Sequence, residues 1–358
     1  MDTNKRFSLI QQVGQEILTE DDLKALLAEK SEFIAYDGFE PSGQMHIAQG
    51  ILRAINVNKM IDAGARFKML VADWHAWANN KLGGDLEKIT IAGQYMIEVW
   101  KAAGMKLDHV DFVWASDIVK DDAYWSVVMK VAIHNTVKRI IRTSQIMGRS
   151  ESDALSAAQI LYPCMQAADI FYLGVDVAQL GMDQRKVNVL AREIGEKIGY
   201  YKPIVVSHHM LQGLQEPPKD VTDAVERATA MKMSKSNPDS AIFMTDSIED
   251  VNRKIKKAYC PEGITEENPI LEYCKYILFE KIDKLVIERP EKWGGNMEFA
   301  SYAALESAFV KKELHPLDLK TAVARELNTL LAPVREHFAQ DARAKQLLEQ
   351  VQRFQITR

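Results

Sequence analysis

The sequence predicts an α/β fold in which a mostly parallel sheet is followed by a helical region. Two apolar runs, at 33–36 and 67–72, flank an amphipathic segment that begins at His46 and ends near Gly64. This strand–helix–strand order favours a parallel βαβ unit, because parallel strands require a crossover connection. Beyond residue 248 the hydrophobic pattern is helical almost without interruption as far as residue 354.

The remaining elements are assigned by the same periodicities. We expect helices over 1–30 and 86–147, another opening at Tyr162-Pro163, and one capped by Asp183 and reaching residue 198. Further strands are expected at 175–180 and 204–206. The change from mixed to helical pattern near residue 245 predicts two domains, at 1–245 and 246–358.

The composition is that of an ordinary globular protein. Of 358 residues, 47% are hydrophobic and 27% charged, and no apolar run is long enough to span a bilayer. The first residues lack the apolar core of a signal peptide, and the three cysteines lack metal-ligand spacing. We therefore expect a cytoplasmic protein without protein metal ligands. The net charge of −5 does not indicate a nucleic-acid binder, although a local basic track can still bind RNA.

A first candidate phosphate site is the turn at 40–43, Glu-Pro-Ser-Gly, which leads to His46. With His46 at the start of the expected helix, unpaired N–H groups and the positive end of the helix dipole would favour an anion. Glycine in such a turn lets the backbone approach a ligand closely. A tight turn with a capping serine explains the same residues without a ligand.

A second candidate is the segment Lys232-Met233-Ser234-Lys235-Ser236, which we place in a loop at 231–240. Two ammonium groups on one loop can stabilise a polyphosphate as its charge develops in a transition state. A solvated surface loop is the alternative interpretation.

A third candidate is the set Tyr162, Gln166 and Asp169, whose spacing puts all three on one face of a helix. Polar groups on an otherwise apolar face need partners, which a polar ligand would supply. A hydrogen-bonded core network would satisfy them equally well. A fourth segment, 181–186, enters a helix with two cations, Arg185 and Lys186, and read alone is a capped helix start with solvated charges.

Taken together and in this order, the four segments resemble tyrosyl-tRNA synthetases of the archaeal and eukaryotic-cytoplasmic branch. The resemblance extends from about residue 32 to about residue 340. It implies a Rossmann-like catalytic domain, an all-helical anticodon-binding domain, and a ligase that activates L-tyrosine with ATP and charges tRNA(Tyr).

The resemblance also implies an amino-acid pocket. Tyr36 and Asp169 would bind the phenolic hydroxyl, and would reject phenylalanine because they would be left unpaired. Tyr162, Gln166 and Gln184 would hold the α-ammonium group, with Glu40 close to the same pocket. Ala72, Asp73 and His75 follow a strand end that should face this pocket.

For ATP, the resemblance implies His46, Lys232 and Lys235 as catalytic residues acting with Mg²⁺. The ATP-binding residues it implies are Gly38, Ser42, Gly43, His46, Gln49, Lys232, Met233, Ser234 and Lys235. One departure is that the signature His-Ile-Gly-His reads His46-Ile47-Ala48-Gln49 here. An imidazolium role is therefore excluded at Gln49, although its amide can still donate a hydrogen bond.

For tRNA, the resemblance implies that Arg185 and Lys186 lie near the acceptor end. Trp293 would stack on an anticodon base and Asp318 would accept hydrogen bonds from its edge. It also implies a homodimer formed through helices at 110–150. Two alternatives stay open: a tryptophanyl-tRNA synthetase, and a non-catalytic synthetase-like protein that binds RNA. Asp169 with Tyr36 favours a phenol over an indole.

Overall fold

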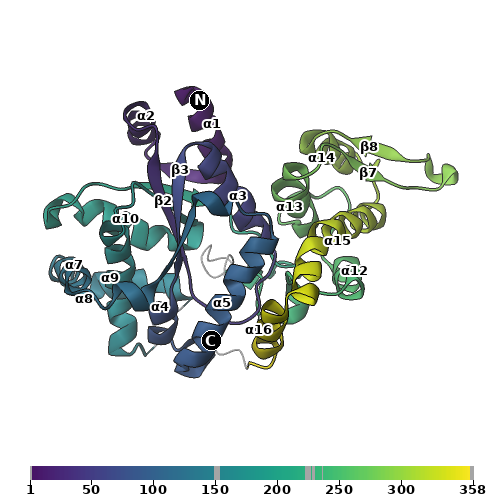
Figure 1. Cartoon of the computed structure of the whole chain (residues 1–358). Helices are drawn as coiled ribbons and strands as arrows, with labels where there is room; N and C mark the ends of the chain where they lie inside the picture. The colour runs from purple at the N-terminus through teal and green to yellow at the C-terminus, as the bar shows by residue number, and fades with distance from the viewer. Residues whose placement is uncertain (1, 149–153, 222–226, 228–229, 236, 355–358) are drawn as a thin grey trace.

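A six-stranded sheet organises the computed structural model, which describes residues 2–148, 154–221, 227, 230–235 and 237–354 (Figure 1). The strands, in their order across the sheet, are β1 (Gly14–Leu18), β6 (Ile204–His208), β5 (Val177–Gly181), β2 (Phe33–Phe39), β3 (Ala65–Val71) and β4 (Val110–Trp114). All neighbouring strands are parallel except the edge strand β1, which pairs antiparallel with β6. The predicted Rossmann-like α/β sheet is confirmed.

Helices cover both faces of this sheet. Those of the first 200 residues are α1 (Thr3–Val13), α2 (Glu20–Glu29), α3 (Ile51–Asp62), α4 (Asp73–Ala78), α5 (Leu86–Ala102), α6 (Ala115–Ile118), α7 (Asp122–Ile133), α8 (Val137–Thr143), α9 (Ala157–Tyr172) and α10 (Arg185–Ile194). Figure 1 shows α7 to α10 on one side of the sheet and α3 and α5 on the other. Two hydrophobic cores result, one on each side.

The alternation of side chains along β2 decides which residues face each core. Phe33 and Ala35 pack into the core shared with α3 and α5, whereas Tyr36 packs into the core beneath α9. Tyr36 is therefore on the face that carries the polar residues of α9.

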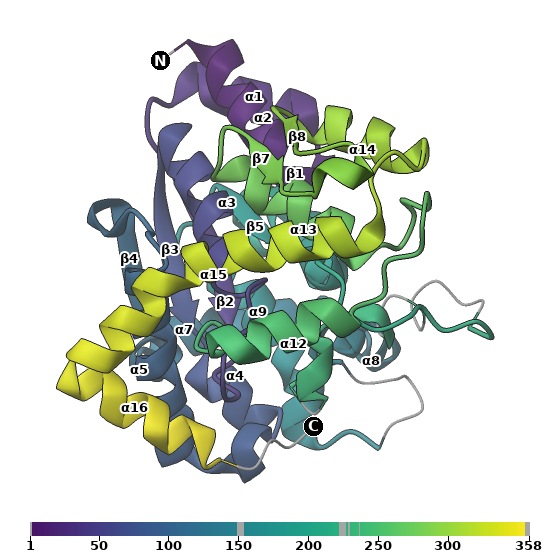
Figure 2. The same ribbon diagram turned by 90° about the vertical axis from the view of Figure 1, so that its right-hand side faces the viewer.

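The C-terminal part packs beside α3 and α5 (Figure 2). It contains α12 (Ile248–Lys257), α13 (Pro269–Tyr276), α14 (Tyr302–Val310), α15 (Pro316–Gln340), α16 (Ala342–Gln352) and a hairpin of β7 (Leu285–Ile287) and β8 (Met297–Phe299). The long helix α15 packs against α12, and α16 packs against α5. The domain boundary near residue 245 stays a prediction. None of the described helices is long and apolar enough to cross a membrane.

Four strands lie where the sequence predicted only helix. β1 interrupts 1–30, β4 interrupts 86–147, and β7 with β8 interrupts 248–354. These strands are three to five residues long, too short to give a clear period-two pattern. Pairing with partners elsewhere in the fold makes them strands.

Three predicted helix starts are also wrong. Helix α10 begins at Arg185, and Asp183 lies in a separate 3-10 turn instead of capping the helix. Helix α3 begins at Ile51 rather than His46, because the backbone from Met45 to Ile47 pairs with a distant segment. Helix α9 begins at Ala157, so Pro163 lies inside it instead of in the first turn. A capping box causes this earlier start: Ser156 Oγ accepts from Gln159 N, and Gln159 Oε1 accepts from Ser156 N.

A buried arginine anchors α1 to the C-terminal ends of α2 and α3. The guanidinium of Arg6 is 6% exposed and donates to the carbonyl groups of Ala63, Leu27 and Lys30 over 2.7–2.8 Å. We expect Arg6→Met to lower the free energy of unfolding by about 3 kcal/mol, because several buried carbonyl groups lose a charged donor. Urea unfolding measures this change.

Arg66→Met is the matched control, since Arg66 makes an exposed pair with Asp111. An equal loss in both variants would contradict the anchoring role of Arg6, because exposed ion pairs contribute little.

Candidate active site

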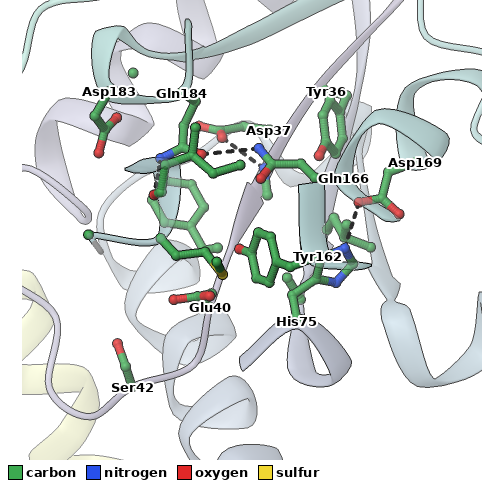
Figure 3. Close-up of a pocket in the computed structure, with 18 of the residues that line it drawn as sticks. Tyr36, Asp37, Glu40, Ser42, His75, Tyr162, Gln166, Asp169, Asp183 and Gln184 are labelled. Carbon is green, nitrogen blue, oxygen red and sulfur yellow. Dashed lines mark hydrogen bonds and ion pairs between the residues drawn. The ribbon is translucent and has the colours of Figure 1, made fainter. Parts of the chain in front are cut away.

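A pocket of about 290 Å³ opens at the carboxyl ends of β2 and β5 (Figure 3). Ligand sites of open parallel sheets are expected at this edge. Nine of the residues predicted from the sequence line it: Tyr36, Gly38, Glu40, Ser42, Tyr162, Gln166, Asp169, Gln184 and Lys232. The wall also includes Ala72 and His75, as expected, but not Asp73. Segments separated by as many as 196 positions in the chain thus converge on one cavity.

Strand β2 contributes the closed end of the pocket. Tyr36 is 1% exposed, and burial, with the negative charges of Asp169 and Asp37, raises its pKa well above the ordinary value. Its hydroxyl therefore stays protonated at neutral pH. A Cβ at Gly38 would lie 3.2 Å from the Tyr36 hydroxyl oxygen, so glycine keeps the space beside that hydroxyl open.

Helix α9 contributes Tyr162, Gln166 and Asp169 from one face, as their spacing predicted (Figure 3). Asp169 is 0% exposed, and its Oδ2 lies 3.0 Å from Nε2 of His75. The two atoms are at ion-pair distance but poorly aligned for a hydrogen bond. Burial lowers the pKa of His75, but nearby carboxylates, chiefly Asp169, outweigh burial and raise it.

Amide and hydroxyl groups form the middle of the pocket. Gln166 donates from Nε2 to Gln184 Oε1 over 3.1 Å, and Gln184 donates to a backbone carbonyl over 3.2 Å. Oε1 of Gln166 is buried and has no hydrogen-bond partner among the described residues. Tyr162 is hydrogen-bonded to Glu40, whose carboxylate also accepts from Asn79. This arrangement presents acceptors to a cationic group.

The opposite side of the pocket is cationic. Lys232 Nζ lies 2.8 Å from Asp183 Oδ2, and Lys235 Nζ donates to Ser42 Oγ over 3.0 Å. Burial, with the charge of Lys81, lowers the pKa of Lys235 to about 7. The loop at 231–240 therefore meets the turn at 40–43, as a shared phosphate site requires. Ser236, the last residue of the predicted loop motif, lies outside the described residues.

His46 lies beside this loop, although not at a helix terminus. Ile47 N donates to Ile242 O over 2.9 Å, and Met244 N donates to Met45 O over 2.9 Å. This pairing carries His46 next to the end of the loop. Burial, and then the charge of Lys235, lowers the pKa of His46 to about 3, so its ring is neutral at pH 7. A neutral imidazole can still donate one hydrogen bond to a phosphate.

The remaining predicted ATP residues lie around His46 and the loop rather than in the wall of the pocket. Gly43 has a φ of 112°, a conformation that favours glycine. Oε1 of Gln49 is buried without a partner among the described residues, and Met233 is buried. The backbone N–H of Ser234 donates to Ser240 Oγ, and the carbonyl group of Ser234 accepts from the same hydroxyl.

The sequence analysis missed a buried polar network beneath the pocket. Arg53, 1% exposed, donates to Asp37 Oδ2 over 2.8 Å and also contacts Gln179 and His208. Burial raises the pKa of Asp37 to about 7 although Arg53 opposes the shift. Arg53 lies in the apolar stripe of α3. A charged residue in such a stripe was the signal in the sequence that could have indicated this network.

The residues predicted to contact RNA lie outside the pocket. Arg185 pairs with Glu16 over 2.6 Å, and Lys186 contacts Gln145. Trp293 is 65% exposed in a short turn, and Asp318 lies in the first turn of α15. The pocket and these residues are therefore separate sites.

No group of three or more His, Cys, Asp or Glu side chains that could hold a metal occurs in the described part of the chain. All three cysteines are free.

Comparisons with known proteins agree with this geometry. The family model described as tRNA synthetases class I (W and Y) matches residues 28–332. The chain is 53% identical over 360 residues to tyrosine–tRNA ligase 1, cytoplasmic, of Arabidopsis thaliana, covering 100% of this chain and 90% of that protein.

Two solved structures resemble the chain to different extents. The crystal structure of the Pyrococcus horikoshii tyrosyl-tRNA synthetase complexed with L-tyrosine has a TM-score of 0.91 and 38% identity, covering 98% of this chain and 100% of that one. The tryptophanyl-tRNA synthetase of Aeropyrum pernix K1 shares the fold, with a TM-score of 0.66 and 18% identity over 93% of this chain and 84% of that one.

The lowered pKa of Lys235 predicts a pH-dependent stability. An unfolded lysine has a pKa of about 10.4, so the folded state disfavours the charged form. The resulting loss in free energy of unfolding is fully present below about pH 7 and disappears as the pH rises towards about 10.4. We expect Lys235→Met to be more stable than the parent at pH 6, with the gain shrinking towards pH 10. Urea unfolding across this pH range measures it.

Lys120→Met, at an exposed position, is the control for removing one positive charge. A gain that is constant with pH, or equal in the two variants, would contradict a Lys235 ammonium group that is destabilised by its surroundings.

Proposed function

Because the chain belongs to the class I tRNA synthetase family of tryptophanyl- and tyrosyl-tRNA synthetases, we propose that its pocket activates L-tyrosine with ATP for transfer to tRNA(Tyr). The chain is a tyrosine–tRNA ligase by its relatives, and the pocket supplies the chemical reason. The deciding observation is the buried carboxylate of Asp169 beside the protonated hydroxyl of Tyr36.

The closed end of the pocket suits a phenol. The substrate hydroxyl would donate to Asp169 and accept from Tyr36, so each polar group would gain a partner. An indole N–H could donate to Asp169 but offers Tyr36 no acceptor, and phenylalanine lacks both functions. An indole would therefore leave the buried Tyr36 hydroxyl unpaired, and phenylalanine would leave both buried groups unpaired, which is costly.

The middle of the pocket would hold the α-ammonium group of tyrosine. Gln166, Tyr162 and Gln184 present oxygen atoms, and Glu40 supplies negative charge nearby. The substrate carboxylate would then point towards the cationic side.

In the first step an oxygen of the tyrosine carboxylate attacks the α-phosphorus of ATP. A bond forms between this oxygen and the α-phosphorus, while the bond from the α-phosphorus to the oxygen that bridges to the β-phosphate breaks. The products are tyrosyl-adenylate and pyrophosphate. The protein forms no covalent bond, so its contribution is positioning and charge stabilisation. Lys232 and Lys235 would neutralise the leaving pyrophosphate, and neutral His46 would donate a hydrogen bond to a phosphate oxygen.

Mg²⁺ would reach the site with the phosphates of ATP. It usually keeps several waters and binds through substrate oxygens together with one or two carboxylates, so a dedicated protein cage is not required. In the proposed ATP site, Gly38, Ser42, Gly43, Gln49, Met233 and Ser234 would contact the nucleotide.

In the second step a hydroxyl of the terminal tRNA ribose attacks the tyrosyl carbonyl and releases AMP. Arg185 and Lys186 would contact the acceptor end, because they directly follow Gln184, a residue of the pocket wall. Trp293 and Asp318 would read the anticodon by stacking and hydrogen bonding. The exposed position of Trp293 supports such a role.

We also propose a cytoplasmic homodimer. Met129, Ile133 and Val137 on α7 and α8 are 54%, 73% and 64% exposed, and apolar residues so exposed on adjacent turns suit a protein interface. A cytoplasmic location is suggested by relatives whose names include that word.

Exchange of labelled pyrophosphate into ATP tests the function without tRNA. We expect exchange with tyrosine and not with tryptophan or phenylalanine, because the buried Asp169 and Tyr36 need a hydroxyl partner. Exchange with tryptophan would instead select the tryptophanyl alternative. Absence of exchange from folded protein would favour a non-catalytic RNA-binding relative.

The role of Trp293 predicts a separation of the two steps. We expect Trp293→Ala to lower kcat/KM for aminoacylation about ten- to a hundredfold, the worth of one base–aromatic stack. Pyrophosphate exchange should be unchanged, since the pocket lies elsewhere. Trp77→Ala, also at an exposed tryptophan, is the control. Equal damage to both steps would indicate a structural role for Trp293.

A further inference from the structure

A buried tyrosine behind the pocket, Tyr124, holds the carboxylate at the closed end. Tyr124 lies in α7 and is 0% exposed. Its hydroxyl group donates a hydrogen bond to Asp169 Oδ1 over 2.9 Å. Burial, and then the charge of Asp169, raises the pKa of Tyr124 well above its ordinary value, so the hydroxyl remains a donor. This hydrogen bond joins two helices that pack directly against each other, α7 and α9.

The hydroxyl of Tyr124 has two acceptors within reach and one proton. The carbonyl oxygen of Met165 lies 3.3 Å away, farther than Asp169 Oδ1. A charged acceptor at the shorter distance forms the stronger hydrogen bond. The proton of Tyr124 is therefore directed to the carboxylate.

The two oxygens of Asp169 have different surroundings. Oδ1 is occupied by Tyr124, which is not part of the pocket wall. Oδ2 lies on the side of His75, a residue of the wall, and has no hydrogen-bond partner within the described part of the chain. Its nearest donor, Nε2 of His75 at 3.0 Å, is at ion-pair distance but poorly aligned, so a ligand hydroxyl would supply the well-aligned hydrogen bond that this oxygen lacks.

The other neighbours of Asp169 cannot replace Tyr124. Tyr36, His75 and Tyr162 are the further titratable groups that face this carboxylate, and all three line the pocket. All three therefore lie where a ligand can contact them. Of these four neighbours, Tyr124 alone contacts the carboxylate from outside the pocket wall.

We propose that Tyr124 is a positioning residue that determines specificity for a phenol. Its hydroxyl fixes Oδ1 of Asp169, and the other oxygen is thereby oriented to accept the hydrogen bond of the substrate hydroxyl. This role rests on the proposed activation of tyrosine. It acts through Asp169 and involves no contact between Tyr124 and the substrate.

Tyr124→Phe tests the role, because it removes one oxygen and keeps the ring. We expect kcat/KM for tyrosine in pyrophosphate exchange to fall about ten- to a hundredfold, the range of a hydrogen bond to a charged group. The fall should be mainly in KM, since the phenol is remote from the reacting carboxylate. For phenylalanine, assayed at high concentration, kcat/KM should be unchanged because no hydroxyl uses the oriented oxygen.

Tyr172→Phe is a closely matched control. Tyr172 packs edge-on against Tyr124 at 5.5 Å and donates to Asp121 Oδ2 over 2.8 Å, but at the surface. The substitution Tyr172→Phe therefore removes a tyrosine–aspartate hydrogen bond of similar length from the same aromatic cluster. Its ratio of tyrosine to phenylalanine activity should equal that of the parent. Thermal unfolding of both variants reports any loss of fold.

Three results would overturn the role of Tyr124. They are an equal loss for tyrosine and phenylalanine in Tyr124→Phe, no loss for either, and the same change of ratio in Tyr172→Phe. Failure of the proposed function is distinguishable, because the parent protein itself would then show no tyrosine-dependent exchange. In that case the role of Tyr124 falls with it.

Discussion

The fully buried carboxylate of Asp169 imposes the main physical constraint on the pocket. A charge inside a protein is costly unless donors surround it, and Asp169 has no exposed surface at all. The structure meets this cost with Tyr124 behind the carboxylate and His75 beside it, while Tyr36 lies on the neighbouring strand. One oxygen is still left without a hydrogen bond among the described residues. The pocket is thus arranged around an interaction that a ligand completes.

The remainder of the pocket continues this electrostatic pattern from one end to the other. Carboxylate and amide groups line the closed end and the middle, whereas Lys232 lies beside Asp183 and Lys235 reaches Ser42 of the turn at 40–43. An amino acid has the complementary order, with its cation in the middle and its carboxylate beyond. Burial, and then the charge of Lys81, lowers the pKa of Lys235 to about 7, although Glu40 opposes the shift. A polyphosphate would add negative charge here and favour the ammonium form.

Much of the site could be predicted from the sequence, because its residues lie in short local patterns. The spacing of Tyr162, Gln166 and Asp169 puts them on one helix face wherever that helix lies, and the structure agrees. The turn at 40–43 and the loop at 231–240 were likewise recognisable as separate segments. Tyr124 was not, since a tyrosine in an apolar helical pattern is indistinguishable from an ordinary core residue until its hydroxyl is seen beside Asp169.

The sequence by itself determined the α/β order and the parallel sheet, because periodicity and turn chemistry are local properties. Its resemblance to a known family also identified nine of the residues that line the pocket. The tertiary structure alone decided what those residues contact. His46 was predicted at a helix start, but pairing of Met45 and Ile47 with residues 200 positions away keeps that segment extended. The pKa values of His46 and Lys235 and the network around Arg53 were decided in the same way. Burial and charge arise from neighbours distant in the chain, and only folding brings those neighbours together.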